Sequence, residues 1–199
     1  MSNKEFLPFE YPEIKGLFGE LFDKLLSESD RGAILIGQAY VEDFLTKFIE
    51  DVLPDKGKKY KTKLLEYPGP LSSFSAKIEL AFAFRLINEN LYGALTELRK
   101  IRNDAAHKSI SFLLTDLKDR LNKVYNLGDG VTGFIREISI KWMMEMKFES
   151  LKSIFDKFEV PEEKRKERVL ELLGDKKILH ALEKQLPHWE LILGLCLLC

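Results

Sequence analysis

Apolar residues recur every three or four positions along most of this 199-residue chain. That spacing is typical of one face of an α-helix, whereas a half-buried strand would alternate apolar and polar residues. No proline interrupts the chain between Pro70 and Pro161, so nothing in this span forces a helix to end. The pattern therefore predicts an all-α protein, a bundle of about five helices with a C-terminal helical extension.

Capping residues, prolines and glycines set the expected helix limits. In the first part of the chain we expect helices over residues 13–26, 30–53, 73–87, 89–107 and 111–124. Residues 55–63 are expected to form a loop or the loose start of a helix. Further along we expect a helix over residues 134–158, a break at Pro161, two short charged helices separated by Gly174, and an apolar end.

Residues 126–133 contain three glycines and form the best candidate linker. We expect this linker to divide a helical bundle of residues 1–125 from an extension of residues 126–199. The extension ends in an apolar run, residues 191–199. Because an undocked run would expose an apolar patch, it should pack on the bundle or on a second subunit.

The predicted helix over residues 74–87 carries apolar residues on nearly every side of its axis. A helix that is apolar all round is normally buried all round. A bundle of this size can cover only part of such a surface. We therefore expect a homodimer in which a second copy covers the rest.

Charge is nearly balanced, with 31 Lys and Arg against 32 Asp and Glu and a formal net charge of −1. This balance argues against a protein that coats nucleic acid over its whole surface. The lysine-rich segment 56–63 is the local exception, and Lys58, Lys59 and Lys61 are candidate phosphate-binding residues. Their alternative role is a solvated loop, so we expect at most weak, sequence-indifferent binding of nucleic acid.

The remaining composition points to a cytoplasmic protein without metal or cofactor. The only cysteines, Cys196 and Cys199, cannot form a disulfide framework and are expected to be reduced thiols. No signal-peptide pattern opens the chain, and a nine-residue apolar run is too short for a bilayer, which needs roughly twenty residues. The three histidines lack the spacing of a metal site.

The densest group of functional side chains lies at the end of the predicted helix 89–107. Asn103 and His107 are four residues apart and share a face, while Arg102 lies about 100° round the helix. Arg102 is suited to hold a phosphate while His107 transfers a proton near neutral pH. The alternative is structural, because the helix dipole favours a histidine at a helix C-terminus.

Residues 102–107, Arg-Asn-Asp-Ala-Ala-His, resemble the Arg-(Asn/Asp/His)-x-x-x-His signature of the HEPN superfamily. Members of that superfamily are helical proteins whose dimers join two such motifs to cleave RNA without metal. The resemblance implies that His107 is the general base on a ribose 2′-hydroxyl and that Arg102 stabilises charge on the phosphate. Asn103 would then orient the imidazole.

A larger part of the chain, residues 20–125, resembles the mannitol operon repressor family of bacterial regulators. Three ordered blocks carry this resemblance: residues 29–48, residues 69–78, and residues 98–107. This resemblance implies a transcriptional regulator. The HEPN motif supplies the alternative, a metal-independent ribonuclease.

No helix-turn-helix with a basic recognition helix is visible in the sequence. We therefore expect regulation through a protein partner rather than through sequence-specific contacts with DNA. Arg31 and Arg99 lie within the matched blocks, so we place the partner surface near them.

Overall fold

The computed structural model describes residues 12–107 and 111–199, and this part of the chain contains helices and no strand. The all-α prediction is confirmed, although the helices outnumber the predicted bundle and extension. The helices are α1 (Pro12–Leu25), α2 (Asp30–Val52), α3 (Lys58–Leu65), α4 (Phe74–Ala83), α5 (Glu89–His107), the 3-10 helix η2 (Leu114–Leu117), α6 (Lys118–Tyr125), α7 (Val131–Lys157), α8 (Glu162–Gly174) and α9 (Lys176–Leu198). The segment on which the signal-peptide expectation rests, residues 1–11, lies outside the described residues.

Two serine caps fix where α2 and α4 begin. The Ser29 hydroxyl accepts a hydrogen bond from the Gly32 amide at 3.1 Å, and Ser73 caps α4 in the same way. The predicted end of α4 at Ile87 is wrong, because the helix stops at Ala83. Arg85 has a φ of 57°, and this left-handed backbone cannot continue a right-handed helix.

The predicted helix over residues 111–124 is also wrong over residues 111–117, since the α-helix begins only at Lys118. The chain instead forms the short η2 and then α6. The Leu114 amide, at the first residue of η2, donates a hydrogen bond to Asp30 Oδ2 of α2 at 2.8 Å. A carboxylate from another helix therefore caps η2. The lysine-rich segment, expected as a loop or a loose helix start, ends in the helix α3.

The C-terminal helix is longer than predicted. Charged residues after Gly174 and the apolar run 191–199 were expected as separate parts, yet α9 runs unbroken from Lys176 to Leu198 with Pro187 inside it. Because the apolar run is buried, a continuous helix satisfies its backbone hydrogen-bonding groups where water cannot reach them. The glycine-rich linker is also shorter than predicted, because α7 already begins at Val131.

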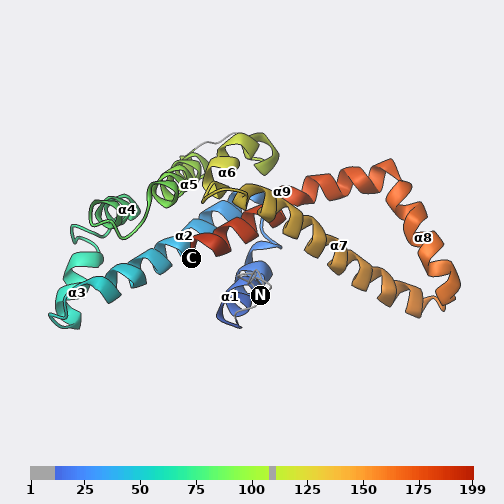
Figure 1. Cartoon of the computed structure of the whole chain (residues 1–199), viewed down its shortest axis with the longest axis horizontal. Helices are drawn as coiled ribbons and strands as arrows, with labels where there is room; N and C mark the ends of the chain where they lie inside the picture. Colours follow the sequence, from blue (N-terminus) through green and yellow to red (C-terminus); the bar gives the residue numbers. More distant parts are fainter. Residues whose placement is uncertain (1–11, 108–110) are drawn as a thin grey trace, which may run out of the picture.

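The C-terminal half of α9 lies in the middle of the bundle (Figure 1). α9 contacts α1, α2, η2, α6, α7 and α8, and Leu191, Ile192 and Leu195 are fully buried. Two glycines allow these helices to approach closely. A Cβ on Gly37 of α2 would overlap Leu195, and one on Gly194 of α9 would overlap the Tyr125 ring.

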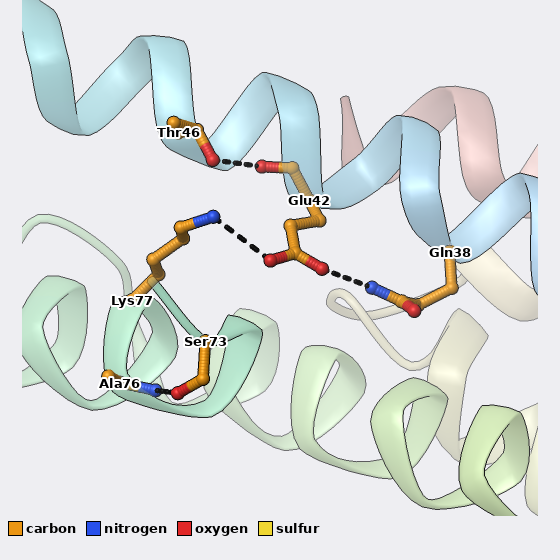
Figure 2. Close-up of polar contacts among 6 residues, drawn as sticks. All are labelled: Gln38, Glu42, Thr46, Ser73, Ala76 and Lys77. Atoms are coloured by element: carbon orange, nitrogen blue, oxygen red, sulfur yellow. Dashed lines mark hydrogen bonds and ion pairs between the residues drawn. The ribbon is translucent and has the colours of Figure 1, made fainter. Parts of the chain in front are cut away.

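A buried ion pair links α2 to α4, as Figure 2 shows. Lys77 Nζ lies 2.9 Å from Glu42 Oε1, and the lysine side chain is only 7% exposed. Gln38 Nε2 donates to the other carboxylate oxygen of Glu42 at 3.0 Å. A buried ammonium needs such a partner, so this contact fixes how α4 sits against α2.

The apolar surface of α4 is covered only in part. α4 packs against α2 and α5, and the Phe82 ring stacks on Tyr92 of α5 with centroids 4.2 Å apart. Phe84, directly after α4, is 70% exposed. That a second copy of the chain covers this surface stays a prediction.

The outer part of α7, α8 and the first half of α9 project from the bundle as three sides of a triangle (Figure 1). We call residues 144–185 the arm. Among the side chains that the structure describes in this arm, none is buried. The nearest buried residues are Met143, Leu186 and Trp189, which form a small cluster at its base.

Replacing Gly194 with alanine is expected to lower the free energy of unfolding by about 1–3 kcal/mol, because the new methyl group meets the fully buried Tyr125 ring. Gly93→Ala is the matched control, since nothing lies within 4 Å of its Cβ position in α5. That change should raise stability by about 0.5–1 kcal/mol. Urea unfolding followed by circular dichroism measures both, and equal effects would contradict the close packing of α9.

Candidate functional site

The end of α5 carries the three residues singled out as candidate catalytic groups. Ala94, Leu95, Leu98, Ile101 and Ala105 are the buried residues of this helix and hold it in place. Arg102 and Asn103 are half-buried, and Arg102 Nη1 donates a long hydrogen bond of 3.5 Å to Asn103 Oδ1. His107, at the last position of α5, is exposed.

Acidic residues of α5 are neutralised from α6. Arg120 Nε lies 2.6 Å from Glu97 Oε1, and its Nη1 lies 2.6 Å from Asp104 Oδ2. Both carboxylates are therefore paired within the bundle. Arg99 and Arg102 lie three residues apart and share a side of α5, which leaves a locally basic surface. We call Arg99 and Arg102 the basic face of α5.

Arg31, which was predicted to lie on a partner surface, is half-buried and contacts α5 within the bundle. Its Nη1 donates to the carbonyl oxygen of Ala105 at 2.5 Å, close to the C-terminus of α5. Its guanidinium also lies 5.7 Å from the centroid of the Phe112 ring. A cation at this position satisfies a carbonyl near the helix end and complements the helix dipole.

The three candidate phosphate-binding lysines take two different roles. Lys58 and Lys59 are exposed on α3. Lys61 is half-buried, and its ammonium donates to the carbonyl oxygen of Glu50 at 2.6 Å. Lys61 therefore ties α3 to the end of α2, and two of the three lysines are left at the surface.

A cavity of about 330 Å³ with a mixed polar and apolar lining lies between η2, α6, α7 and α9 and was not predicted from the sequence. Arg136 Nη1 and Glu190 Oε1 lie 3.1 Å apart in its wall. Burial raises the pKa of the Glu190 carboxyl, while Arg136 opposes that rise. Tyr125 also lines the cavity, and its buried hydroxyl has no hydrogen-bond partner among the residues that the structure describes.

A second unpredicted contact joins four elements at His188. Its Nε2 donates to the carbonyl oxygen of Leu25 at 2.6 Å, and its Nδ1 lies 3.6 Å from Asp30 Oδ1. The other oxygen of Asp30 accepts the Leu114 amide. These contacts connect α9 with α1, α2 and η2. No sequence signal could reveal either site, because residues far apart in the chain meet only after folding.

Within residues 12–107 and 111–199, no group of three or more His, Cys, Asp or Glu side chains is placed to hold a metal ion. No helix described there is both long enough and apolar enough to cross a bilayer. Burial raises the pKa of the Cys199 thiol to about 12 and that of Cys196 further still, so neither cysteine is a thiolate near neutral pH.

No family model, curated protein or solved structure matches this chain. Its function is therefore argued from the arrangement of its own residues.

Replacing Arg31 with methionine is expected to lower the free energy of unfolding by about 1.5–3 kcal/mol, the usual loss for a hydrogen bond made by a charged group. Arg99→Met is the matched control and should change stability by no more than about 0.5 kcal/mol. Thermal unfolding at one protein concentration compares the two variants. A greater loss in Arg99→Met than in Arg31→Met would overturn the structural role of Arg31.

Proposed function

We propose that this protein is a bacterial transcriptional regulator of the mannitol operon repressor type, acting in the cytoplasm through contact with another protein. The observation that carries this proposal is the basic face of α5. Arg99 and Arg102 lie on a helix held by five buried residues, while the nearby carboxylates of Glu97 and Asp104 already pair with Arg120. Such a rigid basic surface suits an acidic surface on a protein partner.

The proposal favours a protein partner over direct recognition of DNA. The lysines left at the surface of α3, Lys58 and Lys59, are able to contact phosphates, which fix position but not sequence. The eight residues of α3 include no Arg, Asn or Gln, so lysine and Thr62 are the only side chains of this helix suited to contact base edges. Binding to nucleic acid is therefore expected to be weak and salt-sensitive.

The regulatory proposal is tested with a mannitol-operon promoter reporter in bacterial cells that express this chain. Arg99→Glu is expected to abolish most of the repression, because it places a carboxylate on the surface that faces an acidic partner. The double variant Lys58→Gln/Lys59→Gln should repress like the unchanged protein while losing its residual affinity for duplex DNA. Loss of repression in the lysine variant alone would overturn regulation through a protein, and absence of repression by the unchanged chain would overturn the regulatory proposal itself.

The second candidate function is that of a metal-independent ribonuclease. The exposed position of His107 favours it, since a general base has to reach a ribose hydroxyl. Arg102, near the same end of α5, would stabilise the charge that develops on the phosphate, and Asn103 would help to position these groups. A dimer would be needed to bring two such motifs together.

The ribonuclease hypothesis predicts that the purified protein cleaves single-stranded RNA in the presence of a chelator. His107→Ala should abolish cleavage with little change in melting temperature, because an exposed side chain contributes little to stability. His180→Ala, which alters another exposed histidine, is the matched control and should leave cleavage unchanged. Cleavage that persists in His107→Ala would assign the activity to another site or to a contaminant.

A further inference from the structure

The arm, residues 144–185, has no core of its own among the side chains that the structure describes. It nevertheless carries large apolar residues, and Phe148 and Phe158 are 43% and 71% exposed. Helices in water gain most of their stability from tertiary packing of an apolar face. The arm therefore lacks a surface that would cover this face.

The apolar residues on the outer half of α7 form a regular seam. Met144, Phe148, Leu151 and Phe155 are spaced four, three and four residues apart, as in the heptad repeat of paired helices. Three of them line an apolar groove of about 270 Å³ whose opposite wall is formed by α8 and α9. The groove residues from that wall are Val169, Leu172, Ile178 and Leu182. Side chains of a helix laid along the seam would therefore enter this groove and contact α8 and α9.

The charged residues beside the seam indicate that a second copy of α7 can pair with it. Glu145 and Lys152 are both exposed, and they lie seven residues apart at the same position of the repeat. If a second α7 runs antiparallel across the seam, Met144 faces Phe155 and Phe148 faces Leu151. The same register places Glu145 beside Lys152 of the other helix, and the two-fold axis makes this contact twice.

We propose that the arm is a dimerisation element, in which α7 of a second copy of this chain lies antiparallel along the seam of the first. The α7 surface is complementary to itself both in its apolar seam and in its flanking charges. The arm contains nearly equal numbers of acidic and basic residues, so its charge does not favour a strongly acidic or basic partner. This contact is distinct from the surface of α4 and does not depend on the regulatory function.

Sedimentation equilibrium on the full-length chain tests the proposal. The unchanged protein should be a dimer at micromolar concentration. Glu145→Lys and Lys152→Glu should each weaken the dimer about tenfold or more, because each change replaces two attractive contacts with two repulsive ones. The double variant Glu145→Lys/Lys152→Glu should restore the original affinity, a result that loss of folding cannot produce.

Two further variants make the outcome decisive. Lys157→Glu also reverses a lysine on the outer half of α7, but at a position away from the seam, and should leave the dimer unchanged. Phe84→Glu alters the exposed surface beside α4, where a second copy is separately predicted, so Glu145→Lys should weaken association by the same factor with and without Phe84→Glu. A protein that stays monomeric at 100 µM, on the order of a hundred times a micromolar dissociation constant, overturns the proposal. So does a dimer that Glu145→Lys does not weaken, or one whose charge reversal the double variant does not rescue.

Discussion

The packing of α9 through the bundle is the constraint on which the rest of this structure depends. Gly37 and Gly194 remove two side chains where α9 meets α2 and the Tyr125 ring, so helix backbones approach closely enough to exclude water. α9 contacts elements from both halves of the chain, and His188 ties its middle to α1, α2 and η2. The C-terminal run is thus part of the core around which earlier helices pack.

Polar contacts then set the positions of the helices around that core. Lys77 and Glu42 join α4 to α2, Arg120 joins α6 to two carboxylates of α5, and Arg31 closes the end of α5. Lys77 is the most deeply buried of these charges, and removing its partner Glu42 would leave it unpaired at a cost on the order of 3–5 kcal/mol. Such pairs disfavour alternative packings, and they hold the end of α5 rigid at the surface.

The molecule therefore presents two surfaces of different chemistry. The basic face of α5 is rigid and belongs to the bundle, whereas the arm is apolar, projects outward and has no buried side chain among its described residues. Separate surfaces allow a protein to form a dimer and bind another molecule at the same time. If the arm pairs two copies, each dimer presents the basic face of α5 twice, and an acidic partner with two sites would bind with increased avidity.

The helical class and the position of His107 at the end of a helix were determined by the sequence, because helical period is a local property. The choice of Ser29 and Ser73 as caps was made by the folded structure. Local patterns did not reveal that Arg85 would end α4 early or that α9 would continue through Pro187. Those outcomes depend on which residues are buried together. The roles of Arg31 and Lys61 were also decided by the tertiary structure, since a long cationic side chain reaches either solvent or a backbone carbonyl. The cavity beside Glu190 and the incomplete burial of the α7 seam were likewise decided by the tertiary structure, because burial is a property of the packed chain and not of any single segment.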